Sequence, residues 1–286
     1  MRLRSFLPFL FLAISTVLFV LPARGLCAHL RVTVAPKIIK QGDAFVVSVR
    51  GAASSALPTA TVGQNEIRFS RCGERCFVGI GAVSYDTRAG LYRIKVMAGK
   101  QKRNIQLTVK KAAFRTASLS LPHEMTSISP TDLEIIREEN ILLNSLFLTV
   151  SERAWDGPFM IPVDNTIVMP FGTKRIMNKT WSSVHRGVDI RGSEGDEVRA
   201  SNNGRVALAR SLFLGGNTVI LDHGQGIHTI YMHLSRTHVV TGDSVSKGDV
   251  IGFIGSTGRA TGPHLHFGIK ISNISVNPLS VLELRL

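Results

Sequence analysis

Cysteine is scarce in this sequence, with only Cys27, Cys72 and Cys76 among its 286 residues. The cysteines alone supply too few ligands for a closed structural zinc site. Compositional signs of disorder are also lacking, because 44% of the residues are hydrophobic. A chain of this length and composition is long enough for two modest folded domains.

The early apolar run, residues 6–21, is short for a membrane-spanning helix, which needs about 20 residues, and Pro8 interrupts it. A positively charged start at residues 1–4 precedes the run, and small and polar residues follow it at 23–28. This order is typical of a secretory signal. We therefore predict a signal peptide over residues 1–28 and export to the periplasm or cell envelope. Membrane contact is expected only through an uncleaved signal segment.

Export would place the remaining cysteines in an oxidising compartment, where disulfides persist. Cys72 and Cys76 then form an even pair, and we expect a disulfide that closes a small loop. A metal pair is the alternative. A lipidated Cys27 fits less well, because residues 24–26 are not the small residues that usually precede such a cysteine.

Acidic residues are rare in residues 29–115, which carry 4 Asp or Glu against 16 Lys or Arg. The balance reverses in residues 116–157, with 7 against 2, and residues 158–286 are mildly basic, with 9 against 13. A concentrated positive surface on an exported domain attracts anionic polymers such as those of a cell wall, or lipid head groups. Nucleic acid is not expected as a partner outside the cell. A basic face that serves only solubility is the alternative.

Residues 29–112 contain short β-type runs separated by Gly, Asp and Ser. The runs are 30–34, 44–49, 91–96 and 105–109. They predict a small immunoglobulin-like β-sandwich as an accessory domain. No catalytic cluster occurs in this segment.

Residues 113–157 are predicted to form a helical connector. Ser129 offers an N-cap, Pro130 a first-turn proline and Asp132 an acidic first turn. Apolar residues then recur at helical spacing, namely Leu133, Ile136, Leu143 and Phe147. The pattern predicts one helix that connects the two domains or packs on one of them, and leaves open whether it shields a cleft.

Residues 158–286 show almost no helix signals, and glycines punctuate their short apolar strands. Residues 195–204 and 242–252 echo each other, since both begin with Gly-Asp and end with glycine. This pattern predicts a compact antiparallel β domain built from repeated hairpins. The whole chain is thus expected to be mainly β.

Seven of the nine histidines lie between residues 185 and 266, a density that packing does not require. His185 and Asp189 are four residues apart, and an extended strand would separate them by about 13 Å, too far to share one ion. We expect the segment to bend, most simply at Gly187, whose missing Cβ gives its backbone more freedom.

Strand alternation predicts which other polar side chains share a cleft. His264 and His266 lie two residues apart and are expected on one face of a strand. Tyr231 and His233 are expected on one face of another strand. Tyr231 can either hydrogen-bond to charge that develops in a reaction or serve structure alone.

Catalytic zinc is held by three protein ligands, and its open fourth position lets a bound water ionise near neutral pH. Two histidines and one aspartate satisfy that count. The glycine-rich segment 255–262 lacks the Gly-Lys-Ser/Thr ending of a phosphate-binding loop. We expect it to lead His264 into the site and to line a substrate groove.

The stretch from His185 to Ile269 resembles the lysostaphin and LytM type of peptidoglycan endopeptidase. The motifs are HRGVD, GDEVRASNNGRV, GGNTVILDHGQGIHTIYMHLS and GDSVSKGDVIGFIGSTGRATGPHLHFGI. The resemblance covers roughly residues 158–286. It implies a zinc metalloendopeptidase that hydrolyses peptide bonds of peptidoglycan, in cross-links or stem peptides.

Carried over position by position, the resemblance implies that His185, Asp189 and His266 bind one zinc ion. His264 would then be the general base, and His233 would orient the water or stabilise the oxyanion. The assignment of base between these two histidines stays open. The alternative function is a non-catalytic wall-binding activator of a separate amidase, but every ligand type is present.

Overall fold

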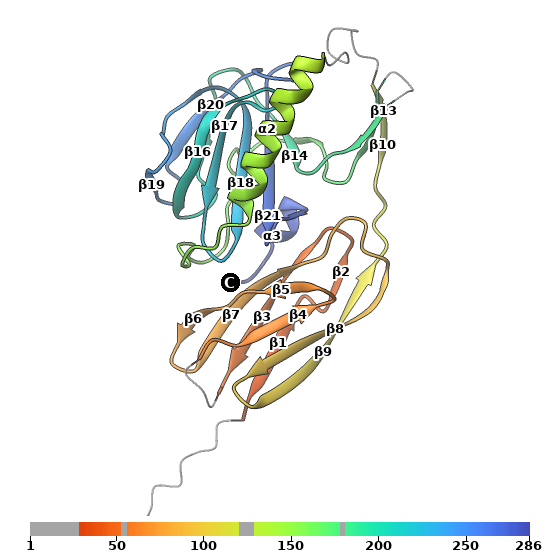
Figure 1. Ribbon diagram of the computed structural model, residues 1–286, viewed down its shortest axis with the longest axis vertical. Coiled ribbons are helices and arrows are strands. Elements are labelled where there is room, and N and C mark those ends of the chain that lie inside the picture. The colour runs from red at the N-terminus through yellow and green to blue at the C-terminus, as the bar shows by residue number, and fades with distance from the viewer. Residues whose placement is uncertain (1–28, 53–55, 120–128, 178–180) are drawn as a thin grey trace, which may run out of the picture.

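The computed structural model describes residues 29–52, 56–119, 129–177 and 181–286, and there the chain is mainly β with two helices (Figure 1). The predicted signal peptide lies outside the described residues. Within the ranges given, no helix is long and apolar enough to cross a membrane.

Nine strands form two sheets in the N-terminal half. They are β1 Arg31–Ala35, β2 Ile38–Lys40, β3 Ala44–Arg50, β4 Thr59–Val62, β5 Asn65–Ile67, β6 Ser70–Gly73, β7 Cys76–Ala82, β8 Gly90–Ala98 and β9 Gln101–Lys110. One sheet has the order β1-β3-β7-β6 and the other β2-β9-β8-β4-β5. Phe45, Phe77 and Ile94 are fully buried in one shared core. The immunoglobulin-like type of this sandwich stays a prediction.

Alternation along β8 shows why this half is basic outside and apolar inside. Ile94 and Val96 are fully buried, whereas Arg93 and Lys95 are exposed. The expected disulfide is present and joins Cys72 to Cys76 across the β6–β7 turn. The metal-pair alternative is therefore wrong.

The helix α2, Pro130–Phe147, begins at the predicted cap. The Ser129 hydroxyl accepts a hydrogen bond from the backbone N–H of Asp132, and the Asp132 carboxylate accepts one from the backbone N–H of Ser129. Apolar residues near its C-terminal end pack on the C-terminal sheet, and Figure 1 shows α2 running along that sheet. The contact joins Leu143, Leu146 and Phe147 to Leu208, Leu212, Ile220 and Ile230.

The predicted connector also contributes a strand that the sequence pattern did not reveal. This strand, β10 Thr116–Leu119, pairs in parallel with β12 Lys174–Met177, which pairs in turn with β13 Trp181–Val184. Together they form a three-stranded arm beside the C-terminal sheet (Figure 1).

The C-terminal half is built on a ten-stranded antiparallel sheet, with a short helix near its end. Its strands are β11 Ile167–Met169, β14 Val188–Arg191, β15 Glu197–Arg199, β16 Gly204–Leu212, β17 Gly216–Asp222, β18 Ile227–Thr237, β19 Ser244–Val245, β20 Val250–Ile254, β21 His264–Ile271 and β22 Ile274–Val276, and the helix is α3 Pro278–Leu282. The main order is β11-β14-β21-β18-β17-β16-β19. The strand that carries the His-x-His pair therefore lies between β14 and β18.

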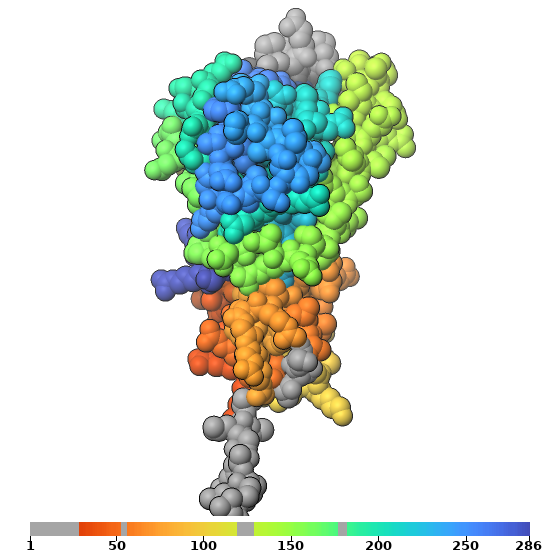
Figure 2. All heavy atoms as spheres, turned by 90° about the vertical axis from the view of Figure 1, so that its left-hand side faces the viewer, coloured from red at the N-terminus to blue at the C-terminus, as the bar shows by residue number. Residues whose placement is uncertain are grey.

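The two halves pack against each other end to end, as Figure 2 shows. Ala44, Val46 and Ile80 of the sandwich join the same apolar core as Phe171 and Val188. Hydrogen bonds also connect the two halves. The Asn277 side-chain amide donates to Asp43 Oδ1 at 3.2 Å, and the Ala44 backbone N–H donates to the Ser280 hydroxyl at 3.0 Å.

Candidate metal centre

Strand pairing brings the predicted ligands together. Asp189 of β14 lies directly opposite His266 of β21. His185, which precedes β14, places its Nε2 2.9 Å from Asp189 Oδ1, and His266 places its Nδ1 2.8 Å from the same oxygen. The two histidine nitrogens are themselves 2.9 Å apart. His185 Nε2, Asp189 Oδ1 and His266 Nδ1 thus form a small triangle of ligand-type atoms.

The expected bend occurs at Gly187, but its physical reason differs from the expected one. Gly187 does not adopt a positive φ angle. A Cβ at this position would lie 2.5 Å from the Phe267 carbonyl oxygen and 2.7 Å from His266 Nε2. The glycine is therefore required because the backbone passes close to the His266 ring.

The donor set fits a divalent metal ion such as zinc. Ligand atoms around tetrahedral zinc are about 3.3 Å apart for metal–ligand distances of about 2.0–2.1 Å, close to the triangle observed. The Nδ1–H of His185 donates to the Pro170 carbonyl at 3.2 Å, so its Nε2 presents a lone pair.

Asp189 is ionised in this setting. It is only 5% exposed, and burial by itself raises the pKa of its carboxyl. The interactions of Oδ1 with the His185 and His266 rings outweigh burial and hold the pKa of Asp189 well below its usual range. Burial also lowers the pKa of His185, which keeps its imidazole neutral as a ligand must be.

His264 and His233 lie beside the triangle in matching arrangements. The Nδ1–H of His264 donates to the Gly262 carbonyl at 2.8 Å, and that of His233 donates to the Thr257 carbonyl at 2.9 Å. Each ring is thereby fixed with its Nε2 as the acceptor, and the two ring centroids are 4.8 Å apart. Burial lowers the pKa of His233 to about 4.

The expectation that Tyr231 and His233 share a face is wrong. The β17–β18 register shifts between Val219↔Tyr231 and Asn217↔Leu234, so β18 holds one extra residue there. His233 sits in this bulge with φ +67 and turns into the pocket. Tyr231 is fully buried on the other side, where its hydroxyl accepts a hydrogen bond from the Ser201 backbone N–H at 2.9 Å.

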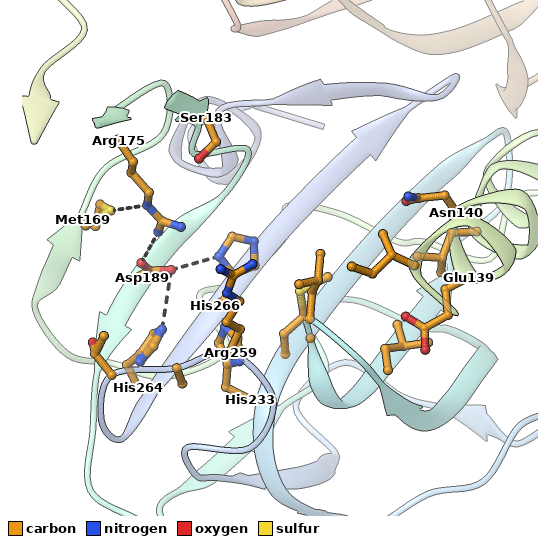
Figure 3. Close-up of a pocket in the computed structure, with 18 residues that line it drawn as sticks. Glu139, Asn140, Met169, Arg175, Ser183, Asp189, His233, Arg259, His264 and His266 are labelled. Carbon is orange, nitrogen blue, oxygen red and sulfur yellow. Dashed lines mark hydrogen bonds and ion pairs between the residues drawn. The ribbon is translucent and has the colours of Figure 1, made fainter. Parts of the chain in front are cut away.

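Asp189 and His266 of the triangle line a pocket of about 410 Å³, together with His233 and His264 (Figure 3). One wall comes from α2, with Glu139 and Asn140 facing the site. Arg175 of β12 and Ser183 of β13 form the opposite wall. The glycine-rich segment contributes residues 259–261, as expected from its sequence.

The sequence did not reveal Arg175 or Glu139 as pocket residues, although it left open whether the predicted helix shields a cleft. Arg175 and Glu139 belong to no recognisable motif, and they reach the site only through the packing of the arm and of α2. The local sequence around Arg175 and Glu139 contains no pattern that indicates a role in a site.

The other histidines of the cluster lie outside the pocket. His223 is fully buried, and its Nδ1–H donates to the Asn203 carbonyl at 2.7 Å. His228 is buried edge-on against Phe147 of α2. His238 packs edge-on against Phe253.

Because His223 is buried, we predict that the folded protein becomes less stable as the pH falls. Burial lowers its pKa from 6.5 to about 4, so the unfolded chain binds more protons between these values. The contribution of neutral His223 to the free energy of unfolding is complete above pH 6.5. It should fall by on the order of 3 kcal/mol as the pH drops to about 4. Urea unfolding of the chelator-treated protein across this range measures it. His223→Gln should flatten the pH dependence, and equal slopes for the two proteins would contradict the assignment.

Comparison with known proteins agrees with this geometry. Residues 183–278 match peptidase family M23. The DD-carboxypeptidase/endopeptidase Mpg of Neisseria meningitidis is 42% identical over 116 residues, which are 40% of this chain and 26% of that relative. The peptidoglycan DD-endopeptidase ShyA of Vibrio cholerae is 40% identical over 95 residues, 33% of this chain and 22% of the relative. The chain thus spans about a quarter of the length of these relatives.

A solved structure extends the similarity beyond the matched segment. The crystal structure of an M23 peptidase from Pseudomonas aeruginosa is 25% identical, with a TM-score of 0.64 over 83% of this chain and 92% of that chain. The resemblance drawn from the HRGVD and PHLHF motifs is confirmed. Residues 183–278 are therefore a domain of peptidase family M23.

Proposed function

We propose that this protein is an exported zinc metalloendopeptidase that hydrolyses peptide bonds of peptidoglycan, in cross-links or stem peptides. The observation that carries the proposal is the triangle of His185, Asp189 and His266, whose ligand atoms are 2.8 and 2.9 Å apart beside two further histidines. The name of the ShyA relative supports peptidoglycan as substrate. That substrate in turn supports the periplasm or cell envelope as the location.

His185, Asp189 and His266 would hold one zinc ion. When bound, zinc supplies a Lewis acid that acidifies a water molecule and polarises the scissile carbonyl. His264 Nε2 takes a proton from the attacking water and returns it to the leaving amine nitrogen as the C–N bond breaks. His233 Nε2 accepts a hydrogen bond that orients the same water. The products are a free carboxylate and a free amine.

Digestion of purified peptidoglycan tests the proposal. The mature protein should release fragments with new amino and carboxyl ends, which mass spectrometry identifies. A chelator should stop the release and added zinc should restore it. His238→Ala, which lies outside the pocket, serves as the matched histidine control. A wall left intact by the zinc-loaded protein would contradict the proposal.

The same incubations test a role for the basic sandwich. Exposed Arg93, Lys95 and Lys102 on β8 and β9 would contact anionic wall polymers. Protein that sediments with the wall should therefore decrease as salt rises. Binding that ignores salt would remove this part of the proposal.

A further inference from the structure

We infer that Arg175 is a positioning residue that holds the Asp189 carboxylate so that only one of its oxygens faces the proposed metal. The inference rests on the proposed function. Arg175 Nη2 donates to Asp189 Oδ2 at 2.7 Å (Figure 3). The other oxygen, Oδ1, faces His185 and His266. The two oxygens of one carboxylate are thus divided between two different partners.

The division matters because the two carboxylate oxygens are chemically equivalent. Without a partner, Oδ2 can rotate toward the same ion and bind beside Oδ1. That would add a ligand beside the bound water and crowd the fourth position, which a catalytic zinc site keeps open for that water. A charge-assisted hydrogen bond from a guanidinium is strong enough to hold Oδ2 aside, particularly where Asp189 is 5% exposed and little water competes.

The fold holds Arg175 firmly in place. Its backbone lies in the middle strand of the arm, opposite Ala117 of β10 and Ser183 of β13. Its Nε donates to Met169 Sδ at 2.8 Å. Met169 is itself the strand partner of Asp189 across β11 and β14. The guanidinium is therefore fixed between two neighbouring strands, and its side chain is only 26% exposed.

Charge alone does not explain an arginine here. A cation beside a metal site repels the metal, so a residue chosen only for its charge would weaken binding. The planar guanidinium instead offers a directed hydrogen bond to one oxygen. The two explanations differ in what they predict for the geometry around the metal.

Cobalt substitution of the full mature protein provides the test, because the visible spectrum of Co(II) reports whether it has four or five ligands. Wild type should give the intense four-coordinate spectrum. Arg175→Met should give the weaker five-coordinate spectrum, together with an approximately 10- to 100-fold lower kcat on peptidoglycan. Arg175→Lys should recover part of both, since lysine can still donate to Oδ2. Lys174→Met, an exposed neighbour on β12, should change neither.

The outcomes separate the inference from the proposed function. An unchanged cobalt spectrum in folded Arg175→Met, verified by thermal melting, would overturn the inference. If that variant does not fold, an unchanged spectrum in folded Arg175→Ala, which also has no side-chain donor for Oδ2, does the same. A spectrum that changes as expected in a protein that never digests peptidoglycan would uphold the inference and overturn the proposed function.

Discussion

His266→Ala is expected to lose both bound zinc and peptidoglycan hydrolysis. The substitution removes one corner of the triangle, whose Nδ1 lies 2.8 Å from Asp189 Oδ1. Zinc supplies several kcal/mol of stabilisation to a transition state, and about 4 kcal/mol corresponds to roughly a thousandfold in rate. Elemental analysis after dialysis measures the zinc, and release of soluble fragments measures the rate.

The control for this variant is again a histidine outside the pocket. His238→Ala should keep one zinc per chain and the wild-type rate. The assignment of His266 as a ligand fails if His266→Ala retains zinc at full occupancy. A variant with lost zinc but an undiminished rate would instead contradict the metal-dependent reaction.

His264→Asn and His233→Asn are expected to keep zinc and lose hydrolysis. Asparagine retains a donor near the position of Nδ1, so the bonds to the carbonyls of Gly262 and Thr257 can persist. Only the Nε2 that faces the pocket is deleted. Loss of a general base should cost ~10²–10⁴-fold in kcat, and loss of the group that orients the attacking water about 10²-fold.

Added imidazole distinguishes the two roles. It should restore activity to the variant that has lost its base, which the proposed mechanism identifies as His264→Asn. Rescue of His233→Asn alone would reverse the two assignments. Full activity in both variants would remove both histidines from the reaction.

Local sequence patterns correctly predicted that His264 and His266 lie on one face of a strand. His264 and His266 share a face because strand alternation holds over those residues, with Leu265 and Phe267 fully buried behind them. The strand pairing that sets Asp189 opposite His266 was not derivable, but it agrees with the predicted cluster.

The sequence-based predictions failed where tertiary packing determines the position of a side chain or helix. Alternation predicted the wrong face for Tyr231, because a bulge adds one residue to β18. Arg175 reaches Asp189 from β12, and one of the two strands paired with β12, β10, lies far back along the chain. The helix α2 was predicted with its cap, but its position beside the pocket depends on contacts with β16 and β18.

The attachment of α2 has a practical consequence for truncation. An expression fragment that begins at residue 158 lacks α2 and β10, although it keeps all three candidate ligands. It would expose Leu208, Leu212 and Ile220, which α2 now covers, and an uncovered apolar patch promotes self-association. It would also remove the strand that supports β12. A changed rate in such a fragment would reflect the altered pocket. Fragments for activity measurements should therefore begin before Thr116.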